Sequence, residues 1–422
     1  MAKVQNIIGW VLVSKQDVAQ AERALLDERK GVRDELGILH LHQVIADTLF
    51  PGTSVLHTRL RYVLFVPWLM RRASEEFPRS PIKALENLEV WLTGKLIDGL
   101  KGSDNPDGVI GRRKYDEPAA QPASFSYWTA LSAWGLLSPR FKGLTREQIL
   151  RALADAKLST RAAVKDEQGR PLAELSPPFA GVVSEPKGFW DGAPQTFDLL
   201  PDEADFLRKH LRAVVDAQSE PSLLSKLATA NEAPSADWPW QDVTVHDVAT
   251  EQQRDMLEFA RRCSSLGGVC RALYLAMVER RAAEIGVCSI GHHQEHLETM
   301  LDGHADTALK LDLAEFSTRK VSFALDDPLP QLFDDTQKWL RGNRRSIDGL
   351  VSIYGRTEWY RKRARSRLAG TDMARARLGL WAEKEARAEA EPLHFRWKNV
   401  RQLLTDLHAA PKKKNRAKAT VA

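Results

Sequence analysis

Residues 49–68 read LFPGTSVLHTRLRYVLFVPW, and this stretch decides the expected fold. The Pro-Gly pair inside it interrupts the backbone and predicts a turn after a helix that runs from about His40 to Leu49. Thr53 or Ser54 suits the N-cap of the next helix, which we expect to continue to about Trp68. Amphipathic patterns of the same kind recur along the chain, so the sequence predicts a mainly α-helical protein.

Charged side chains surround this turn. A Gly-Thr-Ser turn that opens a helix directs free N–H groups outward, which suits an anion. Two positions apart on a helix, two arginines diverge by about 200°, so Arg59 and Arg61 cannot serve one ligand from the same face. One of them is expected to pair with Asp34, Glu35 or Asp47. The block is therefore expected to be either a buried structural network or an anion site, made of Thr53, Ser54, Arg59, Arg61, Asp34 and Glu35.

Length and composition limit the class of protein. The chain has 422 residues, of which 43% are hydrophobic and 28% charged, which excludes a disordered chain or a collagen-like fibre. Its three cysteines are too few for a disulfide framework and suit a reducing cytoplasm. The most apolar stretch, residues 62–70, is far shorter than the ~20 residues that span a bilayer. We therefore expect a cytoplasmic protein with no signal peptide and no membrane partner.

The length allows two or three domains, and composition suggests where they divide. Two helical patterns at Tyr127–Gly135 and Thr145–Ala156, followed by a polar turn at Lys165–Pro171, have the order of a winged helix. A small packing subdomain is the alternative for this module. The expected parts are a helical N-terminal domain (1–123), a winged-helix-like module with a Pro/Gly-rich connector (124–200), a helical C-terminal domain with a basic face (201–409) and a disordered basic tail (410–422).

Basic residues gather late in the chain, although the formal net charge is only +5. Between Lys338 and Arg367 there are ten basic residues and two acidic ones, Asp348 and Glu358, and the tail adds five more basic residues. Arginine forks bind phosphate in bidentate fashion, and the aromatic residues interleaved here can stack bases. The alternative is a solvated face paired with the Glu-rich segment 383–391. We predict nucleic-acid contacts, to DNA more than RNA, from Arg341, Arg344, Arg345, Arg361, Lys362, Arg363, Arg365 and Arg367.

Catalytic signatures are sparse. The cluster Cys288, His292, His293, His296 and His304 has spacings that suit zinc, but no second cysteine pair flanks it, and an ordinary polar helix end is the favoured interpretation. The chain has no phosphate-binding G-x-x-x-x-G-K-[ST] loop and no G-x-S-x-G nucleophile motif. The pattern over 250–285 fits one long helix or a pair broken at Gly267-Gly268. No catalytic residue, metal or cofactor is expected.

A series of motifs resembles a bacterial protein family of unknown function: RDELGI (33–38), LFPGTS (49–54), TRLRYVLFVPW (58–68), YWTALSAWGLL (127–137), FDLLPDEADFLRKHL (197–211) and FRWKNVRQLLTDL (395–407). The resemblance runs from Gly9 to about Leu407, and LFPGTS…TRLRY…PW is its most specific part. It implies gene neighbourhoods with helicases and phospholipase-D-like nucleases, of the kind found in antiphage defence islands. The Lys-rich extension after residue 410 departs from the family pattern, so no function shared with the family is inferred for it.

The resemblance and the basic region together predict a non-catalytic DNA-binding or adaptor subunit of an antiphage defence system, acting with a partner helicase or nuclease. Two alternatives stay open. One is a metal-dependent nuclease that uses the acidic N-terminal residues or the His-rich segment. The other is a protein-only scaffold whose basic face docks an acidic partner.

Overall fold

The computed structural model describes residues 34–103, 106–162, 178–179, 181–319, 321–342 and 346–411, and for 156–162 it describes the backbone alone. Over these residues helices are the regular elements, and a single antiparallel bridge joins Val215 and Pro221. The predicted mainly α-helical fold is confirmed. No helix in the described ranges is long and apolar enough to cross a membrane.

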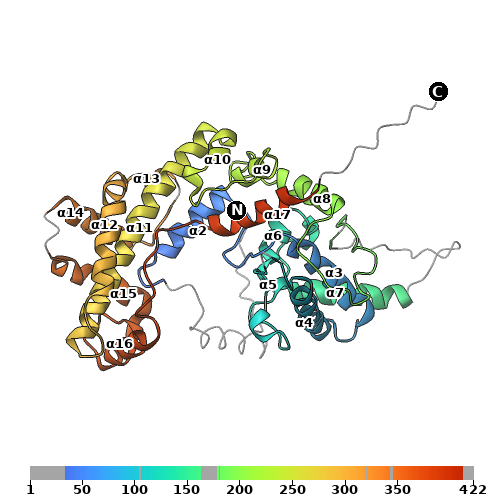
Figure 1. Cartoon of the computed structure of the whole chain (residues 1–422), viewed down its shortest axis with the longest axis horizontal. Coiled ribbons are helices and arrows are strands. Elements are labelled where there is room, and N and C mark those ends of the chain that lie inside the picture. The colour runs from blue at the N-terminus through green and yellow to red at the C-terminus, as the bar shows by residue number, and fades with distance from the viewer. Residues whose placement is uncertain are drawn as a thin grey trace, which may run out of the picture.

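The α-helices carry the labels of Figure 1. Their bounds are α2 Ile38–Leu49, α3 Tyr62–Glu76, α4 Pro81–Gly99, α5 Ala123–Ser126, α6 Trp128–Ala133, α7 Arg146–Ala162, α8 Pro201–Arg212, α9 Leu223–Ala228, α10 Val243–Val248, α11 Glu251–Glu284, α12 His292–Leu309, α13 Glu315–Thr318, α14 Leu329–Arg341, α15 Val351–Lys362, α16 Asp372–Lys384 and α17 Trp397–Ala409. Short 3₁₀ turns connect some of them, among them η5 at Arg363–Arg365, directly after α15.

The molecule is elongated, with helices gathered at its two ends (Figure 1). The α11–α12 hairpin, α14, α15 and α16 form one end, and α3 to α7 form the other. Between them lie α2, from the N-terminal side of the described chain, and α17, from its C-terminal side. The buried hydrophobic residues of all these parts form one connected cluster.

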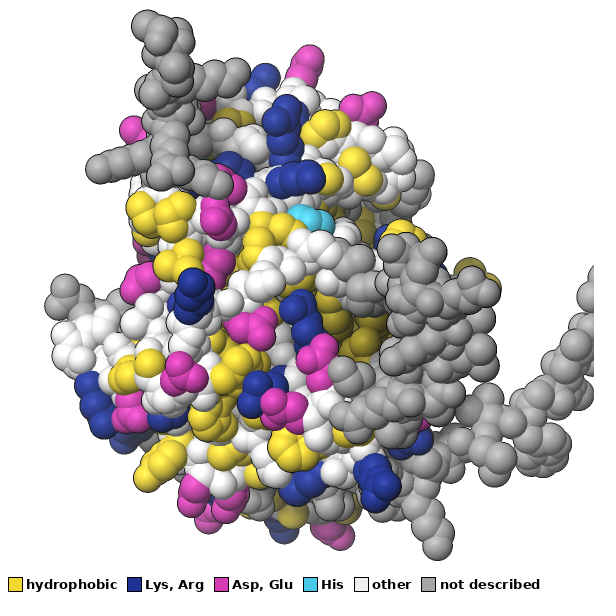
Figure 2. Space-filling view, turned by 90° about the vertical axis from the view of Figure 1, so that its right-hand side faces the viewer, with side chains coloured by type: hydrophobic (Ala, Val, Ile, Leu, Met, Phe, Trp, Pro, Cys, Tyr) yellow, Lys and Arg dark blue, Asp and Glu magenta, His cyan; other side chains and the backbone are white. Residues whose placement is uncertain are grey.

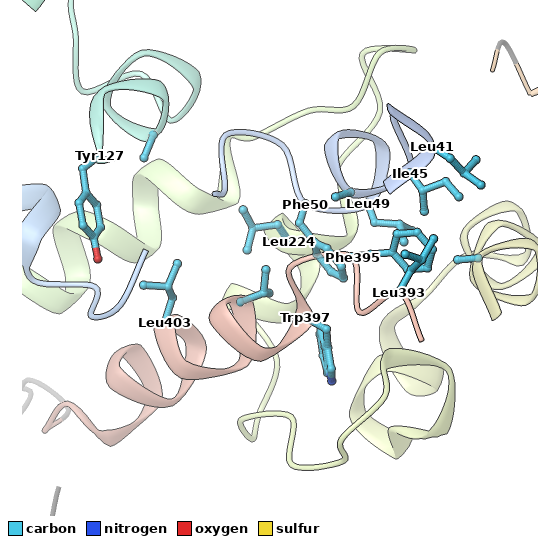
Figure 3. Close-up of a cluster of buried hydrophobic side chains, with 14 of the residues drawn as sticks. Leu41, Ile45, Leu49, Phe50, Tyr127, Leu224, Leu393, Phe395, Trp397 and Leu403 are labelled. Carbon is cyan, nitrogen blue, oxygen red and sulfur yellow. The ribbon is translucent and has the colours of Figure 1, made fainter. Parts of the chain in front are cut away.

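Residues from both sides of the sequence build the middle of this core. Leu41, Ile45 and Leu49 of α2 lie close to Leu393 and Phe395, which precede α17 (Figure 3). The rings of Phe50 and Trp397 are 5.6 Å apart, and both side chains are fully buried. The early and late motifs of the sequence therefore pack into one unit. This packing fixes the positions of the segments that carry candidate functional residues.

Helix α11 is continuous through Gly267 and Gly268, so the broken pair considered from the sequence does not form. A Cβ at Gly267 would lie 2.9 Å from Leu393, and one at Gly268 would lie 3.1 Å from the backbone of Pro392. The glycines therefore let the segment before α17 pack directly on the helix, and their cost in helix propensity is offset by that contact.

The helix predicted to start at Thr53 or Ser54 begins later, at Tyr62, so that prediction is wrong. The Tyr127 hydroxyl accepts the N–H groups of Thr58 and Arg59, at 2.8 and 3.0 Å, and donates to the Arg59 carbonyl at 2.7 Å. These bonds satisfy the backbone along a non-helical path. An open helix N-terminus does not form at the Gly-Thr-Ser turn.

The winged-helix-like module stays a prediction. Helices α5, α6 and α7 occupy its first part, close to the expected helical segments. The polar turn expected at Lys165–Pro171, which would form the wing, lies outside the described residues.

A buried histidine gives the fold a pH dependence. His57 stacks on Tyr127 at 4.4 Å, its Nε2 bonds to the Ser126 carbonyl at 3.0 Å, and burial lowers its pKa to about 4. Below pH 6.5 the unfolded chain binds a proton on this imidazole, whereas the folded protein keeps the ring neutral until the pH approaches 4. The free energy of unfolding should thus fall by roughly 2 kcal/mol between pH 7 and 5 because of His57. Urea titrations of the wild type and of His57→Gln at pH 7 and at pH 5 measure the contribution of His57 to this fall. Equal pH dependence of the two proteins would contradict it.

Candidate functional site

The basic residues predicted to contact nucleic acid fall into three groups. Arg361 and Arg367 point into the protein and form ion pairs. Arg341 is exposed at the C-terminal end of α14, and Lys362, Arg363 and Arg365 lie at the α15–η5 junction. The remaining two, Arg344 and Arg345, lie outside the described residues.

Arg361 joins α15 to the start of α2. Its guanidinium pairs with the buried carboxylate of Asp327 at 2.5 Å. It also fills the space beside Gly37, where a Cβ would overlap it and where φ is +87°. A phosphate would have to displace Asp327 to reach this side chain, so we assign Arg361 a structural role.

Arg367 belongs to a second internal network. Its guanidinium lies 2.8 Å from Glu385 and 3.4 Å from Glu35, one of the acids singled out in the sequence. Beside it, the buried Glu358 carboxylate accepts hydrogen bonds from the hydroxyls of Tyr274 and Ser366, both at 2.6 Å. It also accepts the backbone N–H groups of Arg367 and Leu368. Arg367 therefore serves the packing of η5 rather than an outer surface.

A small cavity of about 90 Å³ lies next to Arg367, and Asp34, Glu35, Arg271 and Glu385 line it. Burial raises the pKa of the Asp34 carboxyl. The cations and carboxylates of this cavity face one another, and the cavity has room for only a few water molecules.

The N-terminal block forms buried ion pairs with partners that the sequence did not identify. The guanidinium of Arg59 pairs with Asp406 at 3.0 Å, and that of Arg61 pairs with Glu203 at 2.8 Å. The pairing predicted with Asp34, Glu35 or Asp47 is wrong. Asp47 instead pairs with Arg396 of the later motif.

The Thr-Ser turn is also satisfied internally. The Thr53 hydroxyl donates to the Phe50 carbonyl at 2.7 Å, and Arg396 donates to the Thr53 carbonyl at 2.8 Å. The Ser54 hydroxyl accepts the N–H of Leu56 at 3.2 Å. Of the two alternatives for this block, the geometry favours the structural network over an anion site.

The His-rich segment does not converge on one point. His296 bonds to the Ala390 carbonyl at 2.8 Å, and His304 bonds to Ser265 at 3.2 Å. His293 is buried against Trp381, with 5.5 Å between the rings. Within the described ranges, no group of three His, Cys, Asp or Glu side chains is placed to hold a metal ion.

An open depression of about 440 Å³ lies between α14 and α15. Arg356, which belongs to the basic run but not to the predicted contacts, lines it together with Trp359, Tyr360 and Arg363. Trp359 is 42% exposed, and the guanidinium of Arg363 lies 5.5 Å from the Tyr360 ring. Arg356 donates to the neutral amide of Gln331.

The acidic residues of the depression already have partners. Asp327 is paired with Arg361, and Asp326 accepts a hydrogen bond from the Tyr360 hydroxyl at 3.1 Å. Among the described residues, Arg356 and Arg363 form no ion pair with a carboxylate. This part of the basic region combines exposed arginine with exposed aromatic surface, which makes it the candidate site.

The opposite end of the molecule has a different surface. Figure 2 faces that end, and on its visible part Lys and Arg side chains alternate with Asp, Glu and hydrophobic ones. Ion pairs between close neighbours occur in this part of the chain, such as Lys83–Glu86 and Lys114–Glu117.

Residues 7–145 match the sequence profile of a family of unknown function (DUF6361). The matched range includes the RDELGI, LFPGTS and TRLRYVLFVPW motifs. Comparison with curated proteins and with solved structures finds no significant match.

The buried pair of Arg61 and Glu203 can be tested by its effect on stability. Arg61→Ala leaves the Glu203 carboxylate buried without its guanidinium, and loss of one partner of a buried pair costs about 3–5 kcal/mol. Arg151→Ala, which removes an exposed arginine paired with Glu147 on α7, should change the free energy of unfolding by less than about 0.5 kcal/mol. Urea denaturation measures both values. If Arg61→Ala lowers the free energy of unfolding no more than Arg151→Ala does, the Arg61–Glu203 pair does not stabilise the contact between the N-terminal block and α8.

Proposed function

We propose that this chain is a cytoplasmic, non-catalytic nucleic-acid-binding or adaptor subunit of a bacterial antiphage defence system, with the chemistry carried by a partner helicase or nuclease. The observation that carries the proposal is the depression between α14 and α15, where Arg356 and Arg363 flank the exposed Trp359. The defence setting comes from the motif resemblance. DNA is the preferred ligand, and the winged-helix-like module predicted at 124–200 is a second candidate contact.

The two arginines of the depression are physically suited to phosphate. A guanidinium binds a phosphate through two parallel N–H···O bonds. Arg356 would exchange a neutral amide partner for a charged one, whereas Arg361 would have to give up the Asp327 carboxylate. The expected surface therefore differs from the one that the sequence suggested: it keeps Arg341, Lys362, Arg363 and Arg365, adds Arg356, and excludes Arg361 and Arg367. Arg344 and Arg345, which lie outside the described residues, stay predicted contacts.

A protein-only scaffold is the second candidate, because the same depression has a composition found at protein interfaces. Leu325 on its rim is fully exposed, and Trp, Tyr and Arg dominate binding hot spots. Such a scaffold would hold its partner at high salt and would not bind DNA.

The nucleic-acid proposal predicts a salt-dependent affinity for duplex DNA, since each phosphate contact contributes about −0.9 to the slope of log K against log salt. Arg356→Ala combined with Arg363→Ala should flatten this slope by up to ~2 units. A matched control combines Arg79→Ala and Arg113→Ala, two exposed arginines at the other end of the molecule that lie outside the winged-helix-like module. Salt-titrated fluorescence anisotropy gives all three slopes.

The outcomes test separately whether the chain binds nucleic acid and whether the depression provides the phosphate contacts. A wild-type slope near zero would contradict nucleic-acid binding by this chain. A normal wild-type slope that only the control variant flattens would place the phosphate contacts elsewhere.

A further inference from the structure

Three side chains of the α15–η5 segment line the depression. Arg356 and Trp359 are three positions apart on α15, a spacing that places residues on one side of a helix. Arg363 follows directly after the end of α15 and lines the same depression. The other side of α15 is buried through Ile353, Tyr354, Thr357 and Glu358. The outer side of this segment therefore presents the Trp359 ring, with one guanidinium before it and another after it in the sequence.

The size of the depression suits one nucleotide rather than a duplex. Its volume of about 440 Å³ falls within the ~300–1,000 Å³ of small-molecule sites. A duplex is read along a groove about 12 Å wide by an element that enters it. A depression lined by an exposed aromatic ring instead receives a base that has left its stack.

The depression carries charges of both signs. Asp326 and Asp327 would repel a phosphate, while their oxygens can accept hydrogen bonds from the amino groups of bases. Arg356 and Arg363 line the same depression, together with the two aromatic side chains. The phosphates then belong beside the arginines, and the base edge belongs toward the aspartates.

The backbone at Arg363 supports a role for this position. Its φ of +51° lies in a region that L residues rarely adopt, so the backbone is strained at this position. In this conformation the arginine lies over the Tyr360 ring, against the depression, at the point where α15 passes into η5.

We propose that this depression binds an unpaired nucleotide of single-stranded nucleic acid, with its base stacked on Trp359 and its phosphates held by Arg356 and Arg363. This inference rests on the proposed function and narrows it from nucleic acid in general to a single strand or an unpaired end. The stacking contact is the new element, because phosphate contacts alone do not distinguish single strands from duplexes.

The first test keeps the number of phosphates constant and removes the bases. An oligodeoxycytidine of about 15 nucleotides should bind about 5- to 150-fold more tightly than an abasic strand of equal length, which is the range expected for one stacked base. Equal affinity would overturn the stacking proposal and leave nucleic-acid binding intact. Binding to duplex DNA without binding to the single strand would also overturn it. Absence of binding to every one of these strands would overturn the proposed function itself.

The second test asks whether the base stacks on Trp359. Trp359→Ala should weaken binding of oligodeoxycytidine by about 5- to 150-fold and leave abasic binding unchanged, whereas Trp359→Phe should retain most of the affinity. Tyr115→Ala is the matched control, because Tyr115 is 61% exposed beside Arg112, Arg113 and Lys114 at the other end of the molecule. An oligodeoxycytidine affinity unchanged in Trp359→Ala, or lowered equally for both strands, would overturn the proposal. Far-UV circular dichroism of each variant verifies that the fold is kept.

Discussion

The fold depends on buried ion pairs that join the early and late motifs of the chain. Arg59 and Asp406 are 347 positions apart in the sequence, yet the guanidinium makes two hydrogen bonds to this carboxylate, which also accepts the Leu60 N–H. A charged group inside a protein is costly unless its partners are in place, so an alternative packing of α17 would leave several charges unpaired. The pairs therefore specify which segments meet, and the surrounding apolar core supplies most of the stability.

The same constraint divides the basic region in two. Arg361 and Arg367 are held by carboxylates from distant parts of the sequence, Asp327 and Glu35, and they position α15 and η5 against α2. Arg356 and Arg363 are left for the outer face. A region that is uniformly basic in sequence thus becomes a structural set and an exposed set, and the second can have a function because the first fixes the helix that carries it.

Sequence patterns were sufficient for the class of fold but not for its long-range pairs. Helical periodicity located α2 and α11 to within a few residues, because local propensity and capping decide such elements. The start of α3 was misplaced, since the hydroxyl that satisfies the preceding backbone belongs to Tyr127, a distant residue. One signal was available: Glu203 lies at helical spacing with Leu207 and Leu211, and all three are buried. A charged residue on the apolar side of a helix indicates a buried partner.

Charge counted in a window of sequence overestimates the exposed charge for a similar reason. The window from Lys338 to Arg367 omits Asp327, Glu35 and Glu385, which pair with its arginines in the folded protein. The buried Glu358 inside that window receives four hydrogen bonds and fixes the rotation of α15. Because this side of the helix is locked inward, Arg356 and Trp359 must face outward. The exposed surface therefore follows from the internal network, and a change that breaks the Glu358 network should disorganise the depression even though no atom of Glu358 reaches it.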